Sequence, residues 1–422
     1  MEATRIRLAE GVHLTYLPAR KFKTSLLSAQ FVTPLRRETA GANALLAAVL
    51  RRGTVSCPDM GALSAKMDNL YDASIDYTVR KKGENQCVGF VASFIDDRYA
   101  PGGERLLEPA AALLGELICD PVTYHGRFVP EYFESEKTNL LEAIRSLIND
   151  KRDWADSRLL RALCDGEAYA VPRLGDEETV DKLQALKVYT QYRDLISTAP
   201  LEIIYSGSAD LERVKQALAA AFATLPREEV RVISMAAPHV CRESVQYVED
   251  VLDVTQGKLG MGFSCGSDDM PALLMGNTLF GGSSNSKLFL NVREKLSLCY
   301  YASSLYHRQK GLITVSSGIE FQNYQRAYDE IMAQLEAVQK GELEDWELEG
   351  ARSTLLNNYA TVGDSQGKLE NFYLGQAATG QHETPADLAR AIQDMTAERI
   401  CRAMSTVKLD TVYFLKGKEA EA

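Results

Sequence analysis

Arg293 and Tyr300 are the residues of this chain whose types and spacing could act most directly on a bound substrate. They stand seven residues apart in the block FGGSSNSKLFLNVREKLSLCYY, which runs from Phe280 to Tyr301. The planar guanidinium of an arginine can fix a carbonyl or a carboxylate, and a tyrosine hydroxyl can donate a hydrogen bond to the oxyanion of a tetrahedral intermediate. Neither role generates a nucleophile. Taken singly, the arginine could instead pair locally and the tyrosine could lie half-buried in a strand.

Three neighbouring features suggest other chemistry, and a structural explanation fits each of them better. The loop GGSSNSK at 281–287 lacks the second glycine that a P-loop has before its lysine, so we expect a tight turn there. Cys299 has no histidine near it in the sequence, which favours a small buried residue over a nucleophile. The acidic run GELEDWELEG at 341–350 is typical of the solvated start of a helix.

The histidines and cysteines do not form a recognisable metal motif. Five histidines and eight cysteines are scattered singly, with no CxxC pair and no two histidines spaced to share a metal on one helix. This pattern predicts reduced thiols that serve mostly as small core residues. Ligands that are distant in sequence could still meet in space.

Length, composition and charge exclude several classes of protein. The chain has 422 residues, 45% of them hydrophobic and 25% charged, which indicates a globular protein of two domains. A net charge of −11 argues against nucleic-acid binding, which needs clustered lysine and arginine. The longest apolar stretches are interrupted within about ten residues, too short to cross a membrane. The N-terminal residues MEATRIRLAEGVHL lack the apolar core of a secretory signal, so we expect a cytoplasmic protein.

The pattern of elements predicts an α+β fold in which strands come first and helices follow. In the first half, a helix at 39–52 precedes a hairpin of 75–80 with 87–94. That half closes with the strand LEIIYSG at 201–207, and the second half closes with TVYFLKG at 411–417. The repeated order predicts two homologous domains, each a mostly antiparallel sheet covered by helices on one face.

The predicted domain boundaries follow from a lapse in this pattern. The stretch from Pro226 to Arg242 shows no clear period and contains two prolines, as an interdomain connection would, and residues 228–242 are the predicted linker. We therefore assign residues 1–227 to a first α+β domain and 243–422 to a second one.

Over nearly its whole length the sequence resembles the inverzincins, the insulinase and pitrilysin-like metallopeptidases, whose signature is H-x-x-E-H on a helix. Members of this family have two homologous α+β domains that face each other like a clam shell around a peptide chamber. The first domain normally carries zinc, and the second contributes an arginine followed seven residues later by a tyrosine. Arg293 and Tyr300 match that second motif. The resemblance therefore assigns them substrate binding and stabilisation of the transition state.

The zinc motif itself is substituted in this chain. In the family, two histidines at i and i+4 share a helix face and bind one zinc, while the glutamate at i+3 activates a water. The matching segment is GANALLAAVLRRGT, which ends in the glycine and threonine typical of the motif. The first histidine, the glutamate and the second histidine fall on Ala44, Ala47 and Ala48.

The third zinc ligand of the family is a glutamate on a later helix. The best match, EKTNLLEAI, places Ala143 at this position, directly after Glu142 and on the same segment as Glu136. A shift of one residue would restore a carboxylate, but one carboxylate alone would not hold zinc. We expect no metal and no other cofactor in this chain, with zinc only in a partner subunit.

Two functions of different classes are compatible with these residues. In the first, the chain is the non-catalytic, substrate-binding subunit of a heterodimeric zinc peptidase, as in some bacterial members of the family. It would then be inactive on its own, bind peptide or unfolded polypeptide as an added strand, and supply Arg293 and Tyr300 to a partner's zinc site. In the second, it is a peptide-binding or scaffolding pseudoenzyme without a proteolytic role. A homodimer and an independent hydrolase with relocated chemistry are further alternatives.

Overall fold

The computed structural model describes residues 3–235 and 237–418, and the chain divides into two compact units. Unit 1 comprises Met1–Arg145, Val171–Met235 and Gly363–His382, and unit 2 comprises Ser146–Ala170, Ala236–Val362 and Glu383–Ala422. The predicted domains were contiguous stretches of chain. The structure differs from them in two exchanged segments, because 146–170 of the first half belong to unit 2 and 363–382 of the second half belong to unit 1.

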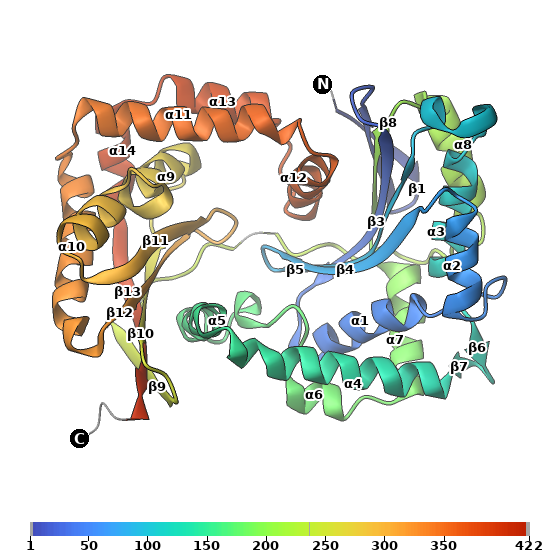
Figure 1. The fold of residues 1–422 in the computed structure, drawn as a ribbon, viewed down its shortest axis with the longest axis horizontal. Coiled ribbons are helices and arrows are strands. Elements are labelled where there is room, and N and C mark those ends of the chain that lie inside the picture. Colours follow the sequence, from blue (N-terminus) through green and yellow to red (C-terminus); the bar gives the residue numbers. More distant parts are fainter. Residues whose placement is uncertain (1–2, 236, 419–422) are drawn as a thin grey trace. The chain divides into compact units, whose positions relative to one another are not determined.

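The sheet of unit 1 has six strands in the order β1-β2-β8-β3-β5-β4 (Figure 1). Their bounds are Thr4–Ala9 (β1), Val12–Pro18 (β2), Thr24–Pro34 (β3), Ser74–Lys82 (β4), Asn85–Ile95 (β5) and Leu201–Gly207 (β8). Only β2 and β8 pair in parallel, and every other neighbouring pair is antiparallel. The predicted hairpin is confirmed as β4 and β5, and its turn places Gly83 at φ 58°, a conformation that glycine adopts without strain.

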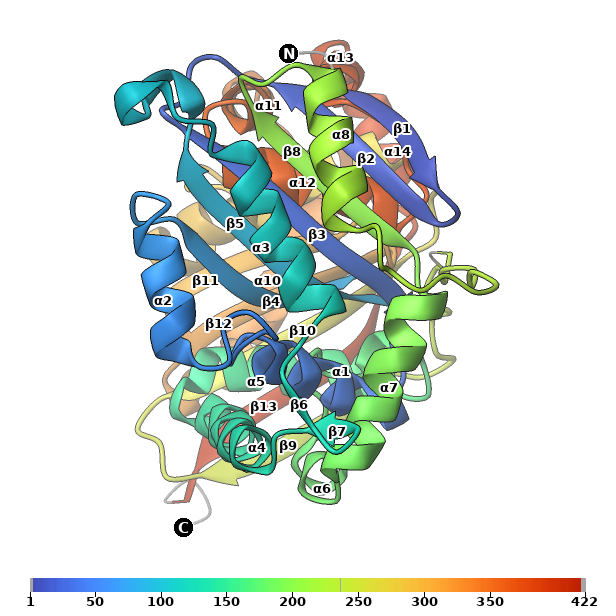
Figure 2. The same cartoon turned by 90° about the vertical axis from the view of Figure 1, so that its right-hand side faces the viewer.

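Helices cover one face of this sheet and form the core of unit 1 with it. They are α1 (Arg37–Leu50), α2 (Met60–Asp68), α3 (Leu107–Cys119), α4 (Pro130–Ser146), α6 (Glu177–Asp181), α7 (Ala185–Thr198) and α8 (Leu211–Ala221). Figure 2 shows α3 and α8 side by side over the sheet. A short hairpin of β6 (Thr123–Tyr124) and β7 (Arg127–Phe128) follows α3.

The opposite face of the same sheet is covered by α12 (Gln366–Ala378), a helix from the second half of the chain (Figure 1). It packs on β3 and β8. Its Glu370 is 3% exposed and accepts hydrogen bonds from the Ser28 hydroxyl at 2.7 Å and from both terminal nitrogens of Arg80 at 2.6 and 2.7 Å. Because both faces of the sheet are covered, β3 is buried along most of its length.

The sheet of unit 2 has five strands in the order β11-β12-β10-β13-β9. Their bounds are Gln246–Leu252 (β9), Gly257–Cys265 (β10), Cys299–His307 (β11), Leu312–Ile319 (β12) and Val407–Gly417 (β13). Here β13 and β9 pair in parallel, and the other pairs are antiparallel.

Unit 2 also receives a helix from the other half of the chain. This helix, α5 (Lys151–Leu163), packs on β10 and β13. Gly260 and Gly262 face it from β10, where an added Cβ would lie 3.2 Å from Leu159 and 2.7 Å from Leu163. Side chains at these two glycines would therefore push α5 away from the sheet.

The remaining helices of unit 2 come from its own half of the chain. They are α9 (Met270–Asn277), α10 (Tyr324–Lys340), α11 (Asp345–Val362), α13 (Pro385–Gln393) and α14 (Ala397–Met404). Two π-helical segments, Thr278–Gly282 and Leu288–Lys295, lie between α9 and β11. No helix of the described residues is both long and apolar enough to cross a membrane.

The topology of the two sheets confirms the α+β fold and supports the predicted internal duplication. The order β2-β8-β3-β5-β4 in unit 1 matches β9-β13-β10-β12-β11 in unit 2, with the parallel pair at the same place. The strands LEIIYSG and TVYFLKG, which the sequence analysis paired by position, occupy equivalent places as β8 and β13. The exchanged helices α5 and α12 are equivalent as well, since each covers the central strands of the sheet from the face opposite the other helices.

The attachment of α12 can be tested by changing Glu370 to Gln. The substitution leaves the buried part of Arg80 without its carboxylate, and we expect it to lower the free energy of unfolding by about 3 kcal/mol. Urea denaturation measures this loss, and hydrogen exchange should show faster exchange in α12. The matched control is Asp364→Asn, which removes an exposed ion pair with Lys21 and should cost less than about 1 kcal/mol. Equal losses for the two variants would contradict a holding role for Glu370.

Candidate functional site

Helix α1 is buried almost all round, and its small side chains make this possible. Every residue from Ala40 to Leu50 is buried, and Ala44, Ala47 and Ala48 are at most 6% exposed. The helix packs against β4, β5, α6 and α7. At Gly41 an added Cβ would meet Val180 at 2.6 Å, so this turn of the helix has no room for a larger residue.

Helix α4 presents a mixed face toward α1. Its buried residues include Phe133, Leu140 and Glu136. The Glu136 carboxylate pairs with Arg52 Nε at 2.9 Å and accepts a longer bond of 3.2 Å from Asn139. This carboxylate is therefore already neutralised by a cation that follows α1 in the chain.

Strand β4 is one of the two edge strands of the sheet in unit 1, and arginines cap part of its outer side. The Ile75 carbonyl accepts a hydrogen bond from Arg51, and the Val79 carbonyl accepts one from Arg173 at 3.1 Å. Backbone groups of alternate residues in an antiparallel strand point to the same side, so the backbone of Tyr77 also faces outward. Between the two arginines, no strand of the described residues pairs with the outward-facing backbone of Tyr77.

A cavity of about 750 Å³ lies where these elements meet in unit 1. Its walls come from α1, β4, α4, the segment before α6, and α12. They consist of Ala44, Ala48, Tyr77, Thr78, Val79, Arg80, Lys81, Lys82, Glu136, Asn139, Leu140, Ala143, Arg173, Leu174 and Asn371.

Three of the four predicted zinc positions thus line one cavity. Ala44, Ala48 and Ala143 share its wall, although Ala143 lies about 95 residues after Ala48 in the chain. Ala47, at the position of the family's catalytic glutamate, is 1% exposed and packs in the core instead. Glu142, the carboxylate that a one-residue shift would use, is exposed and is absent from the cavity wall.

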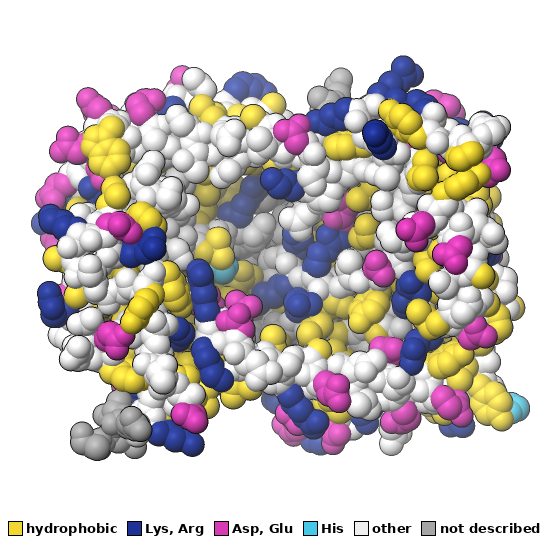
Figure 3. All heavy atoms as spheres, viewed as in Figure 1, with side chains coloured by type: hydrophobic (Ala, Val, Ile, Leu, Met, Phe, Trp, Pro, Cys, Tyr) yellow, Lys and Arg dark blue, Asp and Glu magenta, His cyan; other side chains and the backbone are white. Residues whose placement is uncertain are grey.

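The side chains that surround this cavity are mainly cationic. Figure 3 shows lysine and arginine side chains gathered over the part of unit 1 where β4, β5 and α12 lie. The wall contains four cations, Arg80, Lys81, Lys82 and Arg173, and the single carboxylate of Glu136. Burial lowers the pKa of Lys82, and the charge of Arg80 adds to this effect.

The residues present do not fit a zinc ion. Zinc needs imidazole, thiolate or carboxylate ligands, and alanine supplies none of them. The one carboxylate on the wall is held by Arg52, while the lysines and arginines would repel a divalent cation. These cations were not among the predicted site residues, although the run Arg80-Lys81-Lys82, where the predicted strand 75–80 ends and its turn begins, could have signalled them.

Arg293 lies in unit 2, near the end of the second π-helical segment, and its side chain is 41% exposed. The guanidinium lies over the Phe289 ring at 4.7 Å, and its nearest carboxylate is that of Glu294 at 3.5 Å. The aromatic contact and the weak ion pair hold the side chain loosely. A carbonyl or carboxylate from another molecule could therefore bind to it.

Tyr300 is the second residue of β11, an edge strand of the sheet in unit 2, and is 60% exposed. Its hydroxyl donates a hydrogen bond to Glu320 at 2.5 Å. This bond and the negative charge of Glu320 raise the pKa of Tyr300, so the phenol keeps its proton at neutral pH. Both residues are accessible donors, and no contact between them is recorded among the described residues.

The structure also decides the alternatives for the neighbouring features. Lys287, the lysine of the glycine-serine loop, is buried and pairs with Glu347 at 3.0 Å, so it is not available to a phosphate. Glu347 belongs to the acidic run, and the prediction of a solvated helix start is wrong for this residue, which is 7% exposed. Cys299 is buried, as predicted, and all eight cysteines are free thiols.

A buried ionic cluster in unit 2 brings together residues that could suggest a metal site. Cys164, Glu167 and His239 offer ligand atoms within 4.8 Å of one another. However, the two ring nitrogens of His239 contact the carboxylates of Glu167 and Asp410, at 2.5 and 3.2 Å. The ammonium group of Lys310 lies 2.5 Å from Glu167. The cluster therefore neutralises its own charges and resembles a structural ion network more than a metal centre.

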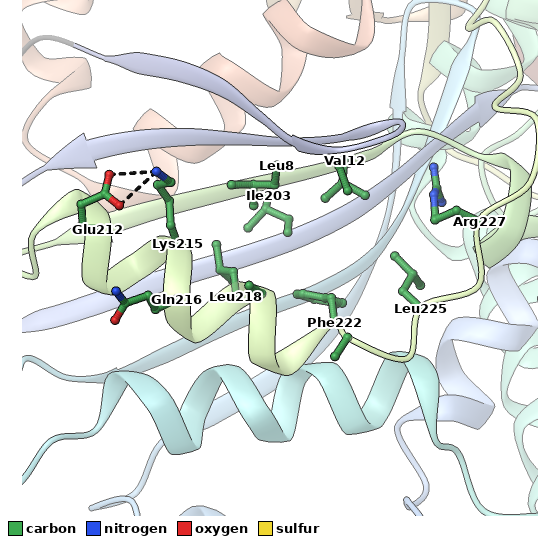
Figure 4. Close-up of a pocket in the computed structure, with 13 residues that line it drawn as sticks. Leu8, Val12, Ile203, Glu212, Lys215, Gln216, Leu218, Phe222, Leu225 and Arg227 are labelled. Carbon is green, nitrogen blue, oxygen red and sulfur yellow. Dashed lines mark hydrogen bonds and ion pairs between the residues drawn. The ribbon is translucent and has the colours of Figure 1, made fainter.

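A second cavity in unit 1, of about 530 Å³, lies between α8 and the strands β1, β2 and β8. Figure 4 shows apolar side chains pointing into it, with the Glu212–Lys215 pair at one end and Arg227 at the other. These apolar residues include Leu8, Val12, Ile203, Leu218 and Phe222. None of the predicted site residues lines this cavity.

Comparison with known proteins agrees with this fold and with the family resemblance. A family model described as "Peptidase M16 inactive domain" matches residues 182–355. A Bacillus subtilis protein named "Probable inactive metalloprotease YmfF" is 34% identical over 416 residues, which cover 97% of this chain and 96% of the relative. A second protein of that organism, named "Uncharacterized zinc protease YmxG", is 20% identical over 318 residues, 74% of this chain and 76% of its own length.

Solved structures show the same architecture. The crystal structure of a conserved protein from Enterococcus faecalis V583 has a TM-score of 0.90 and 27% identity, with 99% of each chain covered. A peptidase M16 inactive domain from Pseudomonas fluorescens has a TM-score of 0.79 over 99% of this chain and 98% of its own, and at 18% identity it shows the fold alone. The fold and the substituted site define an M16-like peptidase homologue without its metal ligands. The chain belongs to the M16 peptidase family and is an inactive member, which confirms the family resemblance found in the sequence.

Restoring the ligands tests the assignment of the zinc positions. The triple variant Ala44→His, Ala48→His and Ala143→Glu places two imidazoles and a carboxylate on one cavity wall, and we expect it to bind one zinc ion per chain. Adding Lys82→Gln should tighten that binding by about tenfold, because it removes a nearby positive charge. Metal content after dialysis and competition with a chelator measure both effects. Equal zinc content in the triple variant and the parent chain would show that the three positions are wrongly assigned.

The buried cluster of unit 2 predicts a dependence of stability on pH. Burial alone would raise the pKa of Asp410, but hydrogen bonds from the Arg242 backbone, Thr411, His239 and the Arg242 side chain together lower it from 3.8. A carboxyl whose pKa is lowered by folding stabilises the protein above its ordinary pKa, and this contribution is lost as the pH falls through the folded-state value.

We therefore expect Asp410→Asn to lower the free energy of unfolding by about 2 kcal/mol at pH 7. The difference from the parent should shrink as the pH falls below 3.8. Thermal unfolding from pH 7 to pH 3 checks this, with the exposed Asp394→Asn as the control. A difference that stays constant over the whole range would contradict the ionised state of Asp410.

Proposed function

We propose that this chain is the non-catalytic, substrate-binding subunit of a heterodimeric zinc peptidase, in which Arg293 and Tyr300 act on peptide bound at the zinc of a homologous partner. One observation carries the proposal: alanine occupies the predicted zinc-motif positions, while the arginine and tyrosine of the second motif are retained and exposed. Residues that bind the substrate and stabilise the transition state can contribute to catalysis when another chain supplies the nucleophile.

The geometry of Arg293 and Tyr300 suits these roles. The guanidinium can take a substrate carbonyl or carboxylate through its planar fork, since its one carboxylate partner among the described residues is Glu294, at 3.5 Å. The Tyr300 phenol stays protonated and can turn from Glu320 to an oxyanion that develops nearby. The hydrogen bond that each group makes to the substrate strengthens most when negative charge develops on the substrate oxygen in the transition state.

The edge strand β4 supports the binding of an extended peptide. The outward-facing backbone of Tyr77 lies between the arginine-capped carbonyls of Ile75 and Val79, beside the cavity of unit 1. Main-chain hydrogen bonds to such an edge bind peptides of many sequences. A substrate-binding subunit of a peptidase needs this tolerance.

The relatives make a homologous partner a reasonable expectation. Bacillus subtilis has both a protein named as an inactive metalloprotease and one named as a zinc protease, and both resemble this chain. By analogy, we expect a zinc-bearing homologue with an intact H-x-x-E-H motif in the organism that makes this chain.

Co-expression with that homologue tests the proposal. We expect peptidase activity to need both chains, and Tyr300→Phe to lower kcat by about 100-fold through the loss of one oxyanion donor. Arg293→Ala should mainly raise KM, since the arginine also binds the ground state. Steady-state kinetics on a peptide substrate measure both effects.

The controls are two exposed residues of the same types, changed as Arg326→Ala and Tyr124→Phe. Activity that is unaffected by all four substitutions would refute the role of Arg293 and Tyr300. Recovery from the native cell with a partner that is not a peptidase, or as a homodimer only, would favour the scaffolding function instead.

A further inference from the structure

The charged side chains around the predicted zinc positions are mostly positive, whereas a metal site has neutral or negatively charged ligands. A zinc site surrounds a cation with neutral or anionic ligands. Here alanines occupy the ligand positions, and four cationic side chains stand around them in a chain whose net charge is −11. This local excess of positive charge is contrary to the overall charge of the protein.

Two cations of the cavity wall have partners that do not cancel their charges. Glu136 is neutralised by Arg52, and Arg80 by Glu370. Lys82 donates to the side-chain oxygen of Asn371 at 2.6 Å, and Arg173 donates to the Val79 carbonyl at 3.1 Å. These last two cations have neutral partners, so their charges remain available to an anion.

We propose that this cavity is an anion-binding site that takes a carboxylate of a bound peptide, held between Lys82 and Arg173. The inference goes beyond the proposed function and rests on it only in taking a peptide as the ligand. Charge-assisted hydrogen bonds to a lysine and an arginine are among the strongest polar contacts in proteins. Burial of Lys82 disfavours its charged form, and a neighbouring carboxylate would restore it.

The carboxylate can come from either of two parts of the peptide. Lys82 lies at the end of β4, which runs from Ser74 to Lys82. A strand added parallel to β4 could place its C-terminal carboxylate at this end, whereas an antiparallel strand could reach it only with an acidic side chain. Both the C-terminus and an acidic side chain would present a carboxylate, and peptide variants distinguish these two sources.

Peptide capture tests the need for a carboxylate. The full chain is immobilised and exposed to a mixture of peptides from a digested unfolded protein, and a second sample of that mixture is methyl-esterified to neutralise every carboxyl group. We expect the unmodified peptides to be retained at least tenfold better than the esters. Equal retention of both samples would overturn the carboxylate site while leaving peptide binding intact. No retention of either sample would refute both the site and the proposed peptide binding.

Synthetic copies of a captured peptide then identify the source of the carboxylate. Amidation of the C-terminus and replacement of internal Glu by Gln each remove one candidate group. Fluorescence anisotropy should show at least tenfold weaker binding for one of the two copies. Weakening by neither would overturn the proposal.

Variants of the chain locate the site. Lys82→Gln with Arg173→Gln should weaken binding of the unmodified peptide at least tenfold, whereas Lys215→Gln on α8 should not. The second test leaves every cation in place: Ala143→Glu puts a carboxylate on the cavity wall, where it should compete with the ligand. Ala143→Gln has nearly the same size, so the difference between these two variants isolates the charge. Equal binding by both, with normal folding, would overturn the proposal.

Discussion

The buried carboxylate of Glu370 is the interaction on which the site in unit 1 most depends. It joins a helix from the second half of the chain to Ser28 on β3 and to Arg80 on β4. The sheet would otherwise expose one face, which its almost continuously buried central strand could not tolerate. The same ion pair fixes the end of β4, from which Arg80 and Lys82 reach the cavity. The contacts of Glu370 that help to cover the sheet therefore also fix residues of the cavity wall.

Two independent features of this chain disfavour zinc at the predicted positions. Alanine at the predicted ligand positions supplies no group that could bind zinc, and the cations of the wall make a divalent ion unfavourable there. The burial of Ala47 away from the wall means that the position of the family's catalytic glutamate has become part of the core. What remains is a cavity lined by alanines and cations beside the edge strand β4.

Much of the fold could be predicted from the sequence, because local patterns determine most of its elements. The hairpin of β4 and β5 follows from alternating residues and a glycine turn, and the duplication follows from the repeated order of strands and helices. The exchanged helix α12 could not be predicted, since it has no clear apolar face. It contacts the sheet through buried polar residues such as Gln366 and Glu370 as well as through Leu369. Periodicity detects an apolar stripe, and a helix held by polar contacts shows none.

The sequence by itself determined that the predicted zinc positions lack metal ligands and that the arginine and the tyrosine of the second motif are present. Residue types at fixed spacing suffice for this, because they decide whether a metal can bind. Alanine cannot ligate zinc in any fold, and Arg293 and Tyr300 are donors in any conformation. Only the tertiary structure decided that Ala44, Ala48 and Ala143 share one cavity, that Lys82 and Arg173 stand around it, and that Glu136 is already neutralised. These facts depend on contacts between residues far apart in the chain, and on burial, which changes the cost of a charge. Neither the long-range contacts nor the burial can be predicted from a local sequence pattern.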